Sequence, residues 1–216
     1  MPPTLRLGSI VALAALAPLA MLQACNRGGG AAPSPETATP LSAYAPQRVV
    51  VTPTARVRAA DTTSWVRQAG SARAVGLRLD SAIATRLRET GLGAHWILPP
   101  ELERAFERNR TYATNPHQLA VEPIRSQAFE AGKRYGEPLS SQLRTLIALH
   151  ADARFVLVPV ELRFDGARAV LRVVLLDPRF AEARWVGELA SDTALAEPTR
   201  ALDQIAERLV LLFVEP

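Results

Sequence analysis

The only cysteine of this 216-residue chain, Cys25, ends an apolar leader and limits how the rest of the chain can be stabilised. Arg6 supplies a positive charge, residues 10–22 are apolar and interrupted only by Pro18, and residues 22–24 form a cleavage site before the cysteine. This order is typical of a secretory signal peptide. Since one cysteine cannot form a disulfide within its own chain, the domain that follows has to be stabilised by packing alone.

Residues 22–25 read Leu-Gln-Ala-Cys and resemble the lipobox of bacterial lipoproteins, from which Gln23 departs because a small or apolar residue is usual there. The resemblance implies a signal peptide over residues 1–24 and acylation of Cys25. Two or more acyl chains, at roughly 0.8 kcal/mol per buried methylene, give a stable attachment to membrane lipid. The alternatives are an ordinary secretory signal with an incidental cysteine, or a transmembrane anchor, for which about 13 apolar residues fall short of the roughly 20 required.

Residues 25–47 are rich in glycine, alanine and proline, which predicts a flexible linker behind the acylated cysteine. About 20 such residues reach on the order of 25 Å as a coil and about 60 Å when extended. Asn26 differs from the aspartate that retains many proteobacterial lipoproteins at the inner membrane. By that resemblance we expect the protein in the cell envelope, anchored to the outer membrane and facing the periplasm.

Residues 48–216 are expected to form a single domain, since about 170 residues lie in the usual range for one. Hydrophobic residues make up 48% of the chain and charged residues 21%, which is typical of a folded protein. The formal net charge is only +4, and in segments such as 101–108 the arginines alternate with acids at helical spacing. That pattern is typical of a solvated, ion-paired helix face, so we expect no nucleic-acid partner.

The first half of this domain predicts strand, helix, strand and helix in that order. Residues 49–51 are three valines, which favour a buried strand. A helix is expected from near Asp80 to Gly91, and a second strand over residues 95–98. Residues 99–101, Pro-Pro-Glu, are suited to the first turn of another helix.

The second half predicts mainly sheet. Periodicity weakens over residues 111–138, where a short helix over 124–135 is expected, and a third helix follows over 139–150 with Ser140 or Ser141 near its cap. Alternating apolar residues then predict strands over 156–164, 169–176 and 184–189, joined by short turns, before a last amphipathic helix from residue 197 to residue 213.

The predicted fold class is therefore α/β (α+β): a mixed sheet that ends in an antiparallel three-strand meander, with helices packed on it. Trp96 and Trp185 are expected in the core. Glu161 is expected to form a cross-strand ion pair with Arg163 or Arg172.

This order of elements resembles the TolB N-terminal domain and its structural relatives, which include the penicillin-binding-protein activator lipoprotein LpoB and the curli-secretion lipoprotein CsgG. The resemblance rests on the helix around Leu79, the step through Ala151-Asp152-Ala153-Arg154-Phe155 into a strand, the Asp177-Pro178 turn and the strand that carries Trp185. It covers roughly residues 49–213 and consists of packing patterns. It implies a TolB N-terminal-like fold for the domain, and residues 111–138 have no counterpart in it.

The sequence contains no phosphate-binding loop, nucleophile elbow or zinc-protease helix, and no Cys/His cluster with the spacing of metal ligands. His95, His117 and His150 lie far apart, each at a predicted loop or at the edge of a predicted element. We therefore expect no catalytic residue, no metal site and no cofactor, and predict that the protein is not an enzyme.

The segment without a counterpart is the predicted interaction loop, because mixed polar and aromatic residues are typical of recognition loops. Its candidate residues are Tyr112, Asn115, His117, Gln118, Phe129 and Tyr135. The predicted function is a non-catalytic interaction or adapter module that binds an envelope protein. The alternatives are a subunit of an envelope assembly or secretion complex, which would form a homo-oligomer, and a small-ligand binder or hydrolase.

Overall fold

The computed structural model describes residues 41–58, 70–150, 153–165, 168–192 and 198–214, all of which belong to the compact unit Thr39–Pro216. The leader, Cys25 and linker residues 25–40 lie outside the described residues. Leu41 is fully buried, so the packed chain extends upstream of residue 48. The α/β fold class predicted from the sequence is confirmed.

A five-stranded mixed sheet forms the centre of this unit, with its main path in the order β1-β3-β4-β5. Strands β1 (Val49–Val51) and β2 (Val57–Arg58) pair in parallel, one after the other, with β3 (Phe155–Asp165). Strands β4 (Arg168–Asp177) and β5 (Glu182–Ala190) continue the sheet in antiparallel pairing. The last three strands are the predicted meander.

Strand β3 is apolar on both sides, which suits a strand covered on both faces. Phe155 and Leu157 face one hydrophobic cluster, and Val156 and Val158 face the other, as the two-residue period of a strand requires. The register of β3 against β4 shifts between Pro159 and Glu161. Proline lacks a backbone donor, so a β-bulge is a favourable place for it.

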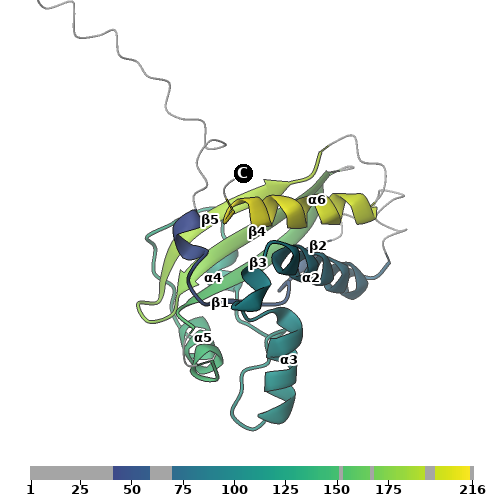
Figure 1. Cartoon of the computed structure of the whole chain (residues 1–216). Helices are drawn as coiled ribbons and strands as arrows, with labels where there is room; N and C mark the ends of the chain where they lie inside the picture. The colour runs from purple at the N-terminus through teal and green to yellow at the C-terminus, as the bar shows by residue number, and fades with distance from the viewer. Residues whose placement is uncertain (1–40, 59–69, 151–152, 166–167, 193–197, 215–216) are drawn as a thin grey trace, which may run out of the picture. The chain divides into compact units, whose positions relative to one another are not determined.

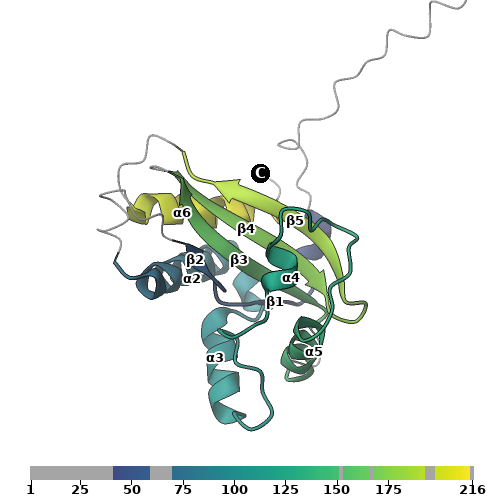
Figure 2. The ribbon, with the colours of Figure 1, turned by 180° about the vertical axis from the view of Figure 1, so that it is seen from behind.

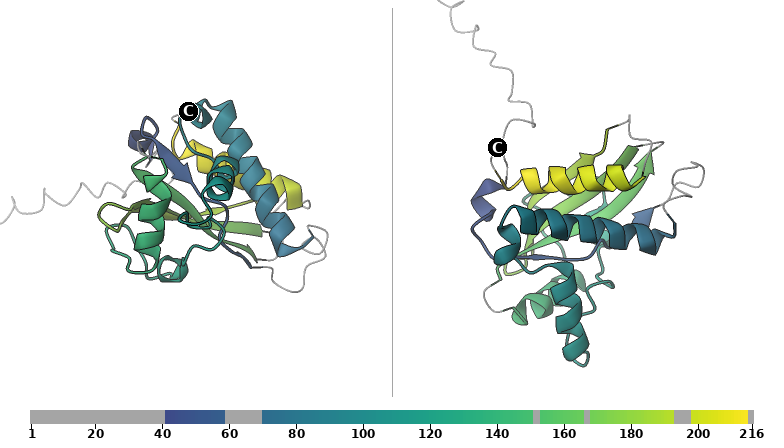
Figure 3. Two further views of the ribbon diagram at one scale, coloured as in Figure 1. Left: turned by 90° about the horizontal axis from the view of Figure 1, so that it is seen from below. Right: turned by 45° about the vertical axis from the view of Figure 1, so that its right-hand side comes forward.

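Helices α2 (Ala72–Glu89) and α6 (Pro198–Leu211) lie side by side on one face of the sheet (Figure 1; Figure 3, right). Their apolar stripes pack against the strand residues Leu171, Val173 and Leu175. The helix residues in this cluster include Val75, Leu79, Ile83, Leu87, Leu202, Ile205 and Leu209. This confirms the predicted placement of the last helix across the meander.

The opposite face carries α4 (Glu122–Arg125), which Figure 2 shows in front of the strands, and α5 (Leu139–Ala148). A second cluster joins Ile124 and Leu143 to the sheet residues Val158, Val174 and Leu176. The sheet is therefore covered on both faces. Among the described residues, none of the helices combines the length and apolar character needed to cross a bilayer.

Helix α2 begins at Ala72, so the prediction of a start near Asp80 is wrong. The side chain of Ser71 caps the helix by accepting a hydrogen bond from the backbone N of Ala74 at 3.2 Å. The predicted termination is confirmed, because the helix ends at Glu89 and Gly91 follows with a φ of 80°. The earlier start places Asp80 in the interior of the helix.

Residues 95–98 do not form the predicted strand. Ile97 alone bridges to β1, donating from its N to Val49 O at 2.9 Å and accepting from Val51 N at 2.8 Å. The 3-10 helix η2 (Leu92–Ala94) precedes this bridge, and α3 (Pro99–Arg108), with the predicted prolines in its first turn, follows it. Two short helical elements leave no room for a longer strand.

The prediction of a helix over 124–135 is also wrong, because α4 is a single turn that ends at Arg125. The predicted third helix is confirmed as α5, although neither Ser140 nor Ser141 caps it with its side chain. Glu137 takes that role by accepting bonds from Ser140 Oγ at 2.5 Å and from Ser141 N at 3.1 Å.

The two tryptophans differ in their environment. Trp96 is 2% exposed and packs edge-on against Phe213, with ring centroids 4.8 Å apart, so its predicted core position is confirmed. Trp185 packs on the same cluster but is only partly buried. Its indole covers Gly187, where an added Cβ would collide with the ring.

Before β1, the 3-10 helix η1 (Ser42–Tyr44) joins the chain to the core. Leu41 N donates to Leu212 O at 3.1 Å, beyond the end of α6. Tyr44 packs edge-on against Phe155 at the start of β3, with a centroid distance of 5.0 Å. Residues that the sequence assigned to the linker are therefore part of the domain.

Candidate functional site

A cleft of about 460 Å³ lies between helix α2, the edge of the sheet at β2 and the loop after α3. Helix α2 contributes Arg73, Gly76, Leu77 and Asp80 to its walls. The sheet edge contributes Thr54 and Val57, and the loop contributes Asn115, His117 and Gln118. The cleft thus combines charged, amide and aliphatic groups from three separate parts of the sequence.

Asp80 is the most buried charged group of this cleft, with 8% of the residue exposed. Its Oδ1 accepts two hydrogen bonds from Thr54, at 2.8 Å from the backbone N and at 2.6 Å from Oγ1. Burial raises the pKa of Asp80 to about 6, although the bonds from Thr54 act in the opposite direction. The carboxylate therefore connects α2 to the sheet edge at a substantial cost in desolvation.

The loop that closes the cleft is held by its own side chains and by two helices. Asn115 Oδ1 accepts from His117 N at 3.0 Å, which is the local turn that asparagine favours. His117 Nε2 lies 2.8 Å from Oε1 of Glu103 on α3. Gln142 of α5 donates to the carbonyl oxygen of Gln118 at 3.3 Å. These contacts fix the loop opposite α2.

Three of the six predicted interaction residues, Asn115, His117 and Gln118, lie together in the cleft. Tyr112 is 73% exposed and is not among the residues that line it. The sequence prediction missed Thr54 and Asp80. A lone aspartate near the expected start of a helix is typical of a capping residue, and no local pattern pointed to its partner Thr54 in the segment between β1 and β2.

The other two predicted residues, Phe129 and Tyr135, are buried in the cluster on the second face of the sheet. Their side chains are unavailable at the surface that the domain presents. Tyr135 Oη is buried and has no hydrogen-bond partner within the described ranges. Burial is also the main cause of the raised pKa of this phenol.

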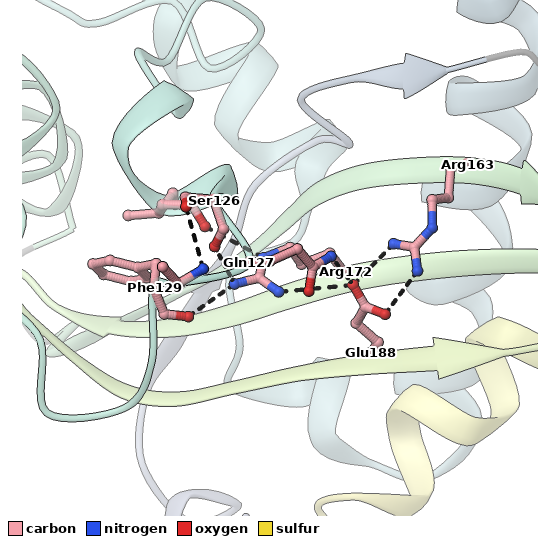
Figure 4. A network of polar contacts seen from close by, with 8 residues as sticks. Ser126, Gln127, Phe129, Arg163, Arg172 and Glu188 are labelled. Atoms are coloured by element: carbon pink, nitrogen blue, oxygen red, sulfur yellow. Dashed lines mark hydrogen bonds and ion pairs between the residues drawn. The ribbon is translucent and has the colours of Figure 1, made fainter.

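Arg172 on β4 holds the segment that contains Phe129 against the sheet (Figure 4). It is 4% exposed, and its Nη2 donates at 2.8 Å to the carbonyl oxygens of both Ser126 and Phe129. Its Nε is 3.4 Å from the carbonyl oxygen of Ile124, and its Nη1 is 3.7 Å from Glu188 Oε1. A charged donor therefore satisfies backbone acceptors in a segment with little regular structure.

Glu188 on β5 completes this network (Figure 4). Arg163 binds it in a bidentate manner, with both nitrogen–oxygen distances at 2.8 Å, and Gln127 donates to it at 2.9 Å. The hydrogen bonds from Arg163 are the main reason that the pKa of Glu188 falls to about 2. The predicted ion pair of Glu161 with Arg163 or Arg172 is not formed.

Glu161 instead lies 3.7 Å from the guanidinium nitrogens of both Arg56 and Arg125. Arg163 and Arg172, the two arginines predicted to pair with Glu161, instead lie beside Glu188. The register of β4 and β5 places Glu188 opposite Arg172. The network supports the loop region and lies outside the cleft.

The histidines do not converge. His95 Nε2 is 2.9 Å from the carbonyl oxygen of Ala45, and only His117 lines the cleft. Burial lowers the pKa of His150, which favours its neutral form. Within the part of the chain that the structure describes, no group of three or more potential ligand residues is arranged to hold a metal ion.

The chain matches no protein-family model and no curated protein. Among solved structures it is similar to the NMR structure of E. coli LpoB, at 14% identity over 88% of this chain and 83% of that one, with a TM-score of 0.42. It is also similar to the LpoB C-terminal domain from Salmonella enterica, at 13% identity over 67% and 82% of the two chains, with a TM-score of 0.38. The PelC dodecamer from Paraburkholderia phytofirmans matches at 16% identity over 78% and 90%, with a TM-score of 0.34. These are likenesses of fold alone.

Proposed function

We propose that this protein is a lipid-anchored, non-catalytic interaction module of the cell envelope, tethered to the outer membrane through Cys25 and facing the periplasm. The support for the tether is the leader and its resemblance to a lipobox. The linker of residues 25–40 then separates the folded unit from the lipid. In this proposal the domain recruits an envelope protein and leaves the chemistry to that partner.

The observation that carries the proposal is the cleft between α2 and the loop of residues 115–118. It gathers amide groups from Asn115 and Gln118, the imidazole of His117 and the half-exposed side chain of Leu77. Such a mixture of adaptable hydrogen-bonding groups with one exposed aliphatic side chain is suited to recognition of a protein segment. Both sheet faces are already covered by helices, whereas the cleft is open to a partner.

In-cell photo-crosslinking of the full-length lipoprotein tests this proposal. A photoreactive residue at Leu77 or Gln118 should capture one reproducible envelope protein. Leu211 on α6 is 49% exposed and does not line the cleft. The photoreactive residue placed there is the matched control and should not capture the envelope protein. Equal capture from the control position, or capture of cytoplasmic proteins only, would contradict the proposal, and exclusive self-crosslinks would favour an assembly of copies.

The tether is tested separately by a Cys25→Ser variant. If Cys25 is acylated, metabolic labelling with palmitate should mark the natural protein and not the variant. The natural protein should then fractionate with outer membranes, whereas the variant should appear in the soluble periplasmic fraction. Labelling of both proteins would contradict acylation at Cys25.

A further inference from the structure

The buried carboxylate of Asp80 lines the cleft and has no cationic partner among the described residues. Both of its hydrogen bonds fall on Oδ1, and both come from Thr54. Within the described residues, Oδ2 accepts no hydrogen bond and Asp80 forms no ion pair, although Arg73 also lines the cleft. Buried carboxylates are normally paired with a cation, so this one retains an unused acceptor.

The basic side chains of the cleft do not supply the missing charge. The charge of His117 favours the ionised form of Asp80. Its Nε2, however, lies 2.8 Å from Oε1 of Glu103. Glu103 itself acts on Asp80 in the opposite sense. Among the described residues, neither Arg73 nor His117 of the cleft wall forms an ion pair with Asp80.

The remaining walls suit the aliphatic stem of a long basic side chain. Leu77 is 48% exposed, and Val57 lines the cleft from the sheet edge. Gly76 of α2 also lines the cleft, and its backbone lies so close to Val57 that an added Cβ would be 3.4 Å from Val57 Cγ2. Lysine and arginine place their methylenes along such apolar surface and their charge at a polar end.

We propose that the cleft binds a lysine or arginine side chain from a segment of the partner protein, with its cationic group on Oδ2 of Asp80 and its stem against Leu77 and Val57. The carboxamide oxygens of Asn115 and Gln118, which also line the cleft, are further acceptors. This inference rests on the proposed function, since it names the chemistry by which the protein partner is recognised.

The test is a titration of the full-length protein in detergent micelles, followed by amide NMR. The probes are blocked tripeptides, acetyl-Ala-X-Ala-amide, in which X is lysine, arginine, norleucine or glutamate. Norleucine keeps the aliphatic stem of lysine and removes the charge. We expect the lysine and arginine peptides to shift the amide signals of Ala55, Leu77 and Gln118, and to bind at least tenfold more tightly than the norleucine peptide.

Asp80→Asn is the matched variant, because asparagine retains an oxygen to accept the bonds from Thr54 but carries no charge. It should abolish the preference for basic peptides. Glu130→Gln removes one charge at a side chain that is 74% exposed and does not line the cleft, and should leave the preference intact. Equal binding of lysine and norleucine peptides, or basic-peptide binding that survives in Asp80→Asn, would overturn the inference. Tighter binding of spermidine than of either peptide would also overturn it, in favour of a small cation.

The experiments distinguish failure of the cation site from failure of the proposed function. If the partner is still captured in cells by the Asp80→Asn variant, the interaction module stands and the cation site is wrong. If the basic peptides bind as expected but no envelope protein is captured at Leu77 or Gln118, the cation site stands and the proposed function is wrong.

Discussion

Thr54 binds the carboxylate of Asp80 twice through the same oxygen, at 2.8 Å from its backbone N and at 2.6 Å from its hydroxyl. One residue thereby joins the edge of the sheet to helix α2 across 26 positions of sequence. Because the pair lies in the cleft, the same contact shapes both the stability of the domain and the charge that a partner meets.

Thr54→Val should destabilise the domain by about 1–3 kcal/mol near neutral pH, because a charge-assisted hydrogen bond to a buried carboxylate is lost. The pKa of Asp80 should rise further, since the lost bond favours the ionised form. Urea unfolding measures the first effect. Thr145→Val, which removes a local bond to Ser141 O within α5, is the control and should change stability by less than about 0.5 kcal/mol.

Asp80→Asn should flatten the dependence of stability on pH. The pKa of Asp80 is about 6 in the folded domain against 3.8 for the unperturbed group, so the folded form binds the proton more tightly. This contribution is fully present below pH 3.8 and is lost as the pH rises through about 6. It amounts to a difference on the order of 3 kcal/mol.

Unfolding of both proteins between about pH 4 and pH 7 checks this expectation. The natural protein should lose stability relative to Asp80→Asn as the pH rises. His117 and Glu103 are present in both proteins, which differ only at residue 80. Parallel curves would show that the carboxylate is not perturbed by burial.

Arg172→Met should cost about 3–5 kcal/mol, because the carbonyl oxygens of Ser126 and Phe129 lose their charged donor, at about 1–3 kcal/mol each. Glu188 keeps its bonds from Arg163. Arg163→Met is the matched control: Arg163 also binds Glu188, but its side chain is 30% exposed, and we expect a loss of at most about 1 kcal/mol. Hydrogen exchange should accelerate over residues 124–135 in the first variant only. Similar costs for the two variants would contradict the role assigned to Arg172.

Tyr135→Phe should be neutral or should stabilise the domain by about 1 kcal/mol, because the hydroxyl is buried without a partner in the described structure. Thermal unfolding of the full-length protein measures the change. A marked loss of stability would reveal a hydrogen bond to this hydroxyl that the described residues do not supply.

The sheet and the last helix were predictable because their signals are local. In the meander, apolar residues alternate over β3 and β4, and the stripe of α6 repeats at helical spacing, so each element follows from its own residues. The start of α2 was missed because Asp80 is typical of a first helical turn, whereas the residue that caps the helix, Ser71, lies more than two turns upstream.

Residues 111–138 were harder to predict because their conformation depends on distant residues. Arg172 bonds the carbonyl oxygen of Phe129 across 43 positions, and no pattern within the loop announces that donor. For the same reason the sequence grouped Phe129 and Tyr135 with the exposed residues of the loop. Asn115, His117 and Gln118 were grouped by their loop composition, and the structure places them in one cleft. Thr54 and Asp80 of the same cleft meet only in the folded chain.

The hydrogen bond between Leu41 and Leu212 also affects how the domain responds to mechanical force applied to the chain before residue 41. Tension would act at once on the end of α6 and, through Tyr44 against Phe155, on the first residue of the central strand. Detaching the segment before β1 would therefore break its bond to Leu212 and its ring contact with Phe155, and would expose Leu41 to water.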